Sequence, residues 1–140
     1  MITMVDRMMS FFEELQRLDN AWRALNQLTK EYEISFEQFM LLKRISLEKR
    51  ITPTALSDEL KISRPAVSRK INQLYRNEYL NKIRSFENED QRIVELEISN
   101  KGNKIMAELD KRFDEKIPDI DFPTQKITET VSLLRKISRD

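Results

Sequence analysis

Apolar residues near the amino terminus recur with gaps that alternate between three and four residues. Such gaps place the side chains along one stripe of an α-helix and form a heptad seam. The spacing predicts a long helix, which either packs into the core of a single domain or pairs with a second copy of itself. The seam comprises Met8, Phe11, Leu15, Leu18, Trp22 and Leu25.

Three shorter helices are predicted next, each preceded by a residue that caps a helix well. Ser35 begins the first, Thr52 begins a helix over residues 53–60 that starts with Pro53, and Ser63 begins the third. Helical spacing assigns an inward face to the first and the third of them. These faces comprise Phe36, Phe39, Met40, Leu42 and Ile45, and then Ala66, Val67, Ile71 and Leu74.

The third helix leaves a polar and basic face outward. Two short helices joined by a tight turn are typical of a helix-turn-helix, whose second helix enters the major groove of DNA. Any antiparallel helix pair would share the apolar spacing, but few would present donors able to reach base edges and phosphates. The outward residues are Arg64, Ser68, Arg69, Asn72, Gln73 and Arg76.

After Leu80 the period changes from that of a helix to that of a strand. Apolar residues at 94, 96 and 98 alternate with glutamates, residues 81–86 can supply a partner strand, and residues 87–91 form a polar turn. A hairpin at this place would be the wing of a winged helix-turn-helix. Arg92 is the candidate probe of a narrow minor groove. Asp90 either holds Arg92 in place or belongs to a solvated acidic turn.

Two further helices close the chain. Ser99 caps the first, which runs to about residue 117, and Pro118 and Pro123 interrupt the helical pattern. The second begins at Thr124. It cannot bury its apolar stripe alone, so we expect it to pack on the first helix of its own chain or of a partner. Its stripe comprises Ile127, Val131, Leu134 and Ile137.

The amino-acid composition excludes several kinds of catalytic and metal-binding site. The chain has no His, no Cys and one Gly, which removes the usual zinc ligands, thiol chemistry and glycine-rich phosphate loops. We therefore expect no enzyme activity, no metal and no cofactor. No apolar run is long enough to span a membrane and the amino terminus does not resemble a signal peptide, so a cytoplasmic protein without a membrane partner is expected.

Charge is distributed unevenly along the chain. The net charge is only +1, yet residues 61–86 hold seven basic side chains against Glu78 alone. Residues 87–98 carry five acidic side chains against Arg92. A local concentration of positive charge is the pattern expected of a nucleic-acid footprint.

The order of elements and three motifs resemble the MarR family of bacterial winged-helix regulators. The motifs are residues 63–69, the Asp90-Gln91-Arg92 element and residues 98–102. The sequence departs from the family pattern at Tyr75, where Glu is frequent, and at Glu78, where Gly is frequent. The resemblance covers nearly the whole chain and implies a mainly α fold with a small β-hairpin wing.

The resemblance also implies a division of labour within one MarR-like domain of residues 1–140. Residues 4–32 and 124–138 would be dimerisation helices, residues 35–98 a winged helix-turn-helix lobe, and residues 99–117 a connecting helix. The implied function is sequence-specific binding of double-stranded DNA by a homodimeric repressor at a pseudo-palindromic operator. A winged-helix adaptor that binds protein instead of DNA is the alternative.

Site residues follow from motif position. The implied base-reading set is Arg64, Pro65, Ser68, Arg69 and Asn72; the backbone-contacting set is Thr54, Lys61, Gln73, Arg76 and Arg84; and the wing set for the minor groove is Asp90 and Arg92.

Many relatives bind a small aromatic or anionic effector between the dimer helices and the lobe. Aromatic residues at helical spacing could line such a crevice here, with Arg23 as partner for an anion, but core packing explains the same spacing. The candidate lining is Trp22, Arg23, Tyr32, Phe36, Phe39 and Met40.

Overall fold

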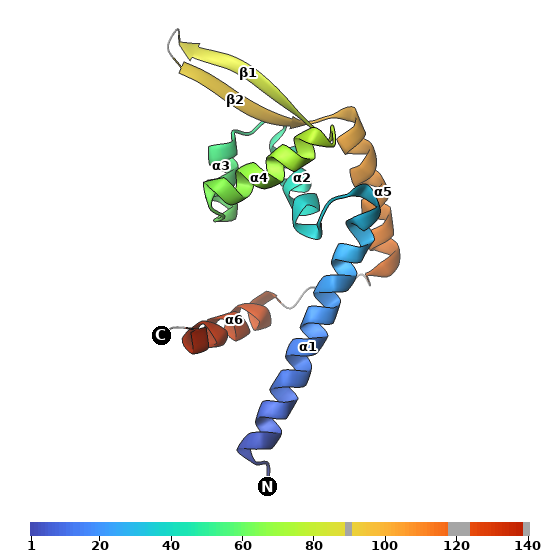
Figure 1. The fold of residues 1–140 in the computed structure, drawn as a ribbon, viewed down its shortest axis with the longest axis vertical. Coiled ribbons are helices and arrows are strands. Elements are labelled where there is room, and N and C mark those ends of the chain that lie inside the picture. The colour runs from blue at the N-terminus through green and yellow to red at the C-terminus, as the bar shows by residue number, and fades with distance from the viewer. Residues whose placement is uncertain (89–90, 118–123, 139–140) are drawn as a thin grey trace.

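The computed structural model describes residues 1–88, 91–117 and 124–138, and these are mainly helical. A winged lobe lies at one end of a long first helix, and the last helix lies beside that first helix, away from the lobe (Figure 1). The predicted fold class is therefore confirmed. In chain order the elements are α1 (Met4–Thr29), the 3-10 helix η1 (Lys30–Tyr32), α2 (Phe36–Glu48), α3 (Pro53–Leu60), α4 (Arg64–Arg76), β1 (Leu80–Asn88), β2 (Gln91–Ile98), α5 (Asn100–Lys116) and α6 (Thr124–Ser138).

The predicted helix starts are confirmed in detail. The side chains of Ser35, Thr52, Ser63 and Ser99 each accept a hydrogen bond from a backbone N–H in the first turn of the helix that follows. At Ser35 the cap is reciprocal, because the Gln38 side chain accepts a hydrogen bond from the Ser35 N–H at 2.8 Å. Caps of this kind satisfy amide groups that have no partner within the helix.

The hairpin is antiparallel, with Leu80 opposite Ile98 and Phe86 opposite Arg92, and it reaches further toward its turn than residues 81–86. A third backbone segment joins its base. The amide of Ile51 donates to the Leu96 carbonyl at 3.1 Å, and the Leu96 amide returns a bond of 2.8 Å. This bridge ties the segment between α2 and α3 to the wing.

The hydrophobic core lies within the lobe, where α2, α3, α4, the hairpin base and α5 meet. The predicted inward face of α2 is confirmed at Phe39, Leu42 and Ile45 and wrong at Met40, which is 38% exposed. Leu41 is buried instead. The buried face of α2 includes positions 38, 41, 42 and 45, and at 100° per residue Met40 lies on the other side of the helix. The fully buried side chains include Leu56, Val67, Leu74, Leu80, Leu96 and Leu109.

The turn between α4 and β1 depends on the backbone conformation of Glu78 and on the small size of Gly102. Glu78 has a φ of 66°, the left-handed conformation that glycine adopts without strain, and it stands where the resembling family often has Gly. Gly102 in α5 packs directly beneath this turn. A β-carbon there would lie 2.8 Å from Ile98 Cγ2 and closer still to the Tyr79 carbonyl oxygen, so only glycine fits.

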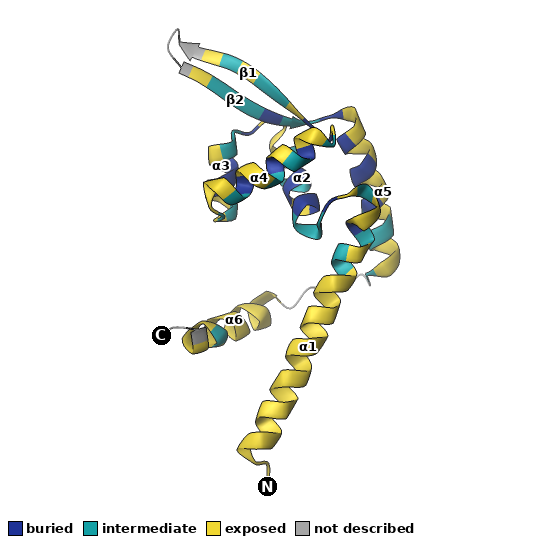
Figure 2. Ribbon diagram, in the orientation of Figure 1, coloured by how far each residue is buried: buried dark blue, intermediate teal, exposed yellow. Residues whose placement is uncertain are grey.

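The terminal helices differ from the lobe because their apolar side chains face solvent. Residues 4–24 are all exposed, and residues 124–133 are exposed as well (Figure 2). Only the end of α1 enters the lobe, where the buried Thr29 hydroxyl donates to the Ile34 carbonyl at 2.8 Å. No described helix is long and apolar enough to cross a membrane.

A junction of polar side chains fixes α5 against the end of α1. Arg112 donates to Glu31 at 2.8 Å and lies 5.1 Å from the Tyr32 ring centroid, while the Tyr32 hydroxyl donates to Glu108 at 2.7 Å. The hydrogen bond from Arg112 lowers the pKa of Glu31. Burial is the main cause that raises the pKa of Tyr32.

Candidate nucleic-acid interface

Helix α4 is held so that its polar side faces outward. Val67, Ile71 and Leu74 are buried, and this stripe fixes the rotation of the helix about its axis. Ser63 caps the helix and Pro65 occupies its first turn, which orders the end nearest to α3. The side chains left exposed are Arg64, Pro65, Ser68, Arg69, Asn72, Tyr75 and Arg76.

The two faces of the hairpin carry opposite charge. Side chains alternate between faces along a strand, and residues directly opposite in an antiparallel pair share a face. One face carries the cations Lys82, Arg84 and Arg92, whereas the other carries Glu95 and Glu97. The cationic face is the one directed at α4, because Lys82 contacts that helix. We call the exposed side of α4 together with Lys82, Arg84 and Arg92 the basic face.

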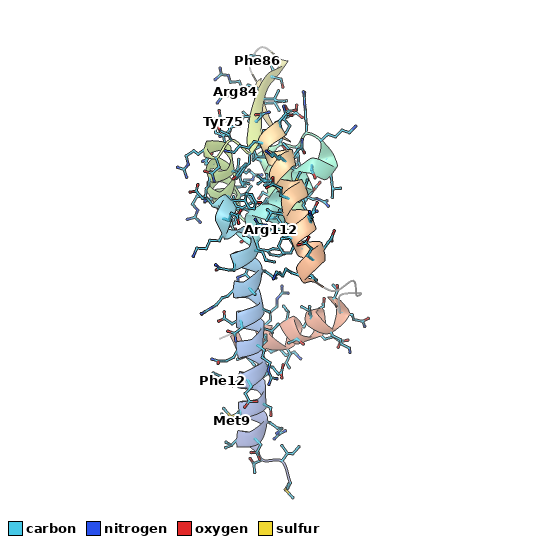
Figure 3. The ribbon with its side chains drawn as sticks, turned by 90° about the vertical axis from the view of Figure 1, so that its right-hand side faces the viewer. Met9, Phe12, Tyr75, Arg84, Phe86 and Arg112 are labelled. Atoms are coloured by element: carbon cyan, nitrogen blue, oxygen red, sulfur yellow. The ribbon has the colours of Figure 1, made fainter. Side chains whose placement is uncertain are left out.

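Arg92 lies near the outer end of the basic face, opposite Phe86. Its guanidinium carbon lies 5.9 Å from the Phe86 ring centroid, a cation–π contact, and Phe86 is 65% exposed. Figure 3 shows Phe86, Arg84 and Tyr75 following one another from the wing toward α4. Asp90, the predicted partner of Arg92, lies outside the described residues.

Lys82 joins the hairpin to α4. Its ammonium group donates a hydrogen bond of 3.1 Å to the Asn72 side-chain oxygen and lies 4.5 Å from the Tyr75 ring centroid. Sequence reasoning assigned no role to Lys82 or Tyr75. Strand alternation alone could have placed Lys82 on the side of Arg84, but its contact with Asn72 depends on how the hairpin folds back on α4.

The predicted backbone-contacting residues fall into two groups. Thr54, Lys61, Arg76 and Arg84 are exposed and available to a ligand. Gln73 is half-buried and its amide is already used, because it donates to the Glu33 carbonyl at 3.1 Å and accepts from the Gln38 side chain at 3.0 Å. The position of Gln73 therefore fits a structural link between α4 and the start of α2.

Three of the six candidate effector residues belong to one aromatic cluster with Phe113. The Trp22 ring meets Phe36 edge-on at 5.7 Å, Phe36 lies 5.5 Å from Phe113, and Phe113 stacks on Phe39 at 5.2 Å. Phe39 is 1% exposed, so it belongs to the core and cannot line an open crevice. The remaining candidates lie apart: Arg23 is exposed and pairs with Asp19 at 3.0 Å, Met40 faces solvent, and Tyr32 belongs to the junction with Arg112.

Among the described residues, no group of three or more Asp and Glu side chains is arranged to hold a metal ion. The basic face offers hydrogen-bond donors and positive charge, which lie on an exposed helix and on the adjoining hairpin. A helix with this exposure beside a projecting hairpin is the arrangement of a winged helix-turn-helix, as the sequence predicted. The family can be named more closely from the sequence.

Residues 23–109, more than half of the chain, match the family described as transcriptional regulator SarA/Rot. The chain belongs to this family of transcriptional regulators. The matched segment runs from the end of α1 into α5 and contains α2, α3, α4 and the hairpin. No relative was found among curated protein sequences.

Solved structures with the same fold cover nearly the whole chain. The transcriptional regulator BldR from Sulfolobus solfataricus has a TM-score of 0.61 and 17% identity, over 96% of this chain and 99% of that one. A MarR family protein from Bacillus stearothermophilus has a TM-score of 0.59 and 20% identity, over 97% and 96%. A MarR variant from E. coli complexed with operator DNA has a TM-score of 0.57 and 16% identity, over 96% and 98%.

Proposed function

We propose that the protein is a repressor that binds double-stranded DNA sequence-specifically as a homodimer. The observation that carries the proposal is the basic face, in which Lys82 links the exposed side of α4 to Arg84 and Arg92 on one side of the hairpin. A helix of this kind fits the major groove, and an arginine on a wing gains from the negative potential of the minor groove. The acidic opposite face of the hairpin disfavours the reverse orientation.

Each part of the basic face has a proposed role. Thr54, Lys61, Arg76 and Arg84 position the lobe on phosphates, and Arg92 enters the minor groove with Phe86 as its platform. Gln73 is left out because its amide is engaged within the lobe. Asp90, which lies outside the described residues, keeps the role predicted from the sequence, which is to hold Arg92 in place. The proposed base-reading residues are Arg64, Pro65, Ser68, Arg69 and Asn72.

A second copy of the chain is the proposed partner of the terminal helices. Monomeric proteins rarely leave a long contiguous apolar surface in water, and α1 and α6 together do so. Between them lies an apolar cleft of about 480 Å³, of a kind that a helix from a second copy can fill. The cleft is lined by Met4, Arg7, Met8, Phe11, Leu133 and Ile137.

In this proposal residues 4–32 and 124–138 interlock with the partner, residues 35–98 bind DNA, and residues 99–117 connect the two. A two-fold dimer reads a pseudo-palindrome whose half-sites are about one helical turn, or about 34 Å, apart. A dimer seated on such a site covers promoter DNA, which leads to repression. The protein acts where the chromosome lies, in the bacterial cytoplasm.

The test is a fluorescence-anisotropy titration of labelled duplex DNA with the full chain, at several salt concentrations. We expect salt-sensitive binding that Arg92→Ala weakens by about 1–3 kcal/mol on a selected site. The matched control is Arg50→Ala, since Arg50 pairs with Glu97 on the acidic face of the hairpin. Equal affinity of Arg92→Ala and wild type would remove the wing from the interface, and absence of salt-sensitive binding would favour the protein-binding adaptor.

A further inference from the structure

Asn72 lies at the centre of the exposed side of α4, and one end of its side-chain amide already has a hydrogen-bond partner. Its oxygen accepts the 3.1 Å hydrogen bond from the Lys82 ammonium group. We infer that Lys82 is a positioning residue that determines base specificity, by presenting Asn72 to DNA as a hydrogen-bond donor, so that guanine is preferred over adenine at the base facing Asn72. This inference rests on the proposed function.

The orientation of the Asn72 amide follows from the chemistry of its partner. A lysine ammonium group has three donors and no acceptor, so the end of the amide that lies next to it must be the oxygen. The amide nitrogen, with its two hydrogens, is then the end left free, whereas the oxygen keeps one lone pair beside a cation. A hydrogen bond from a charged donor is about twice as strong as one between neutral groups, which keeps the oxygen on Lys82.

Lys82 itself is held in place from two sides. Its ammonium group lies 4.5 Å from the Tyr75 ring centroid, and Tyr75 follows Asn72 by one helical turn on α4. In the hairpin, Lys82 is opposite Leu96, which is fully buried and bonded to Ile51, so the register of the strand is fixed by the core. A half-buried lysine with these contacts is pre-ordered before any ligand arrives.

The base edges respond differently to such an asparagine. A free Asn pairs with adenine through both ends of its amide, because adenine offers the N7 acceptor and the N6 amino donor in the major groove. When the Lys82 ammonium group holds this oxygen, the adenine amino group would have to share it with a cation, and its hydrogens would face those of the ammonium group. Guanine presents two acceptors, N7 and O6, and matches the remaining amide hydrogens and the spare hydrogens of the ammonium group.

The experiment is selection of bound duplexes from a randomised library, followed by sequencing, with the full chain and its variants. Wild type is expected to enrich guanine at the position that loses its preference in Asn72→Ala. In Lys82→Met, which keeps most of the stem and removes the charge, the guanine-to-adenine ratio there should fall by about tenfold, within the range that one bidentate pair contributes. Lys82→Arg retains a donor and should retain the guanine preference.

Arg84→Met is the matched control, because Arg84 lies on the same face of the hairpin as Lys82, whereas Lys82 is the residue bonded to Asn72. We expect Arg84→Met to lower the affinity for all sequences by the same factor, without a change in the preferred bases. If Lys82→Met behaves in the same way, or if adenine is preferred by wild type, the inference is overturned while DNA binding stands. If wild type shows no salt-sensitive binding to any duplex, the proposed function fails first. Thermal melts of each variant confirm that the lobe is folded.

Discussion

The winged lobe and the terminal helices are built from similar residues but bury them differently. In the lobe, Phe39, Leu42 and Leu96 are between 0% and 1% exposed and the charges lie outside. In the terminal helices, Leu18 is 58% exposed and Ile137 is 68% exposed (Figure 2). The lobe thus closes on itself, whereas the helices carry an apolar surface that the described part of the chain leaves uncovered. In the proposed dimer, the lobe would therefore determine the stability of the fold and the terminal helices would determine assembly.

The charge pattern follows the same division. In the lobe, the basic face gathers cations of α4 and the hairpin outside the core. On α1, charged residues pair with near neighbours in sequence, such as Arg23 with Asp19. Such exposed pairs stabilise a helix only slightly, which leaves the apolar seam as the feature that would dominate the proposed association.

The largest effect is expected from charges placed on the seam of α1. Leu15→Asp combined with Leu18→Asp removes four buried leucines from a two-fold dimer, each contributing about 1.5–3 kcal/mol. We therefore expect a monomer of 16.8 kDa by sedimentation equilibrium at micromolar concentration, with an unchanged far-ultraviolet spectrum of the lobe. A variant that remains dimeric would show that the seam is not the contact surface.

A core substitution in the lobe should lower the free energy of unfolding instead of dissociating the dimer. Leu42→Ala removes a fully buried side chain from α2 and should lower the free energy of unfolding by about 2–5 kcal/mol, independently of protein concentration. The matched Leu18→Ala should cost stability only in so far as the dimer contributes, so its effect should depend on protein concentration. Urea denaturation at two protein concentrations distinguishes the two effects. The same concentration dependence for both variants would contradict the proposed difference between the lobe and the terminal helices.

A smaller, stabilising effect is expected at the turn between α4 and β1. Glu78→Gly relieves the left-handed strain at this position, which costs a non-glycine residue about 1–2 kcal/mol, partly offset by the greater chain entropy of glycine. Urea denaturation should show a gain of about 1 kcal/mol within the lobe. A loss of stability would mean that the 3.9 Å ion pair of Glu78 with Lys101 matters more than the strain.

The smallest effect concerns the junction between the two regions. The pKa of Glu31 lies below its usual 4.5 because Arg112 donates to it, so the folded protein binds that proton less readily than the unfolded chain. This contribution to stability is present above pH 4.5 and is lost as the pH falls through the lowered pKa. The stability difference between wild type and Arg112→Gln should therefore shrink on acidification, as measured by urea denaturation at several pH values. A difference that is constant with pH would assign the role of Arg112 to packing on Tyr32.

The sequence was most informative where structure depends on near neighbours. The caps at Ser35, Thr52, Ser63 and Ser99 could be predicted because capping is decided within one helical turn. Strand alternation likewise predicted the hairpin and put Arg84 and Arg92 in it.

Features that depend on distant segments could not be predicted in this way. The bridge between Ile51 and Leu96, the engagement of Gln73 by Glu33 and Gln38, and the contact of Lys82 with Asn72 all join separate elements. Helical spacing alone does not reveal which neighbour an outward side chain meets. For that reason the division of α4 into engaged and available polar groups emerged only from the fold.

The most direct test of the account is the salt dependence of DNA affinity, measured in parallel for wild type and for the Leu15→Asp, Leu18→Asp variant. If each lobe neutralises about four phosphates, the slope of log affinity against log salt should be about −7 for the dimer and about half that for the monomer. Those two slopes would establish that the lobe binds DNA and that the terminal helices double the contact. Equal slopes, or affinity that does not change with salt, would contradict it.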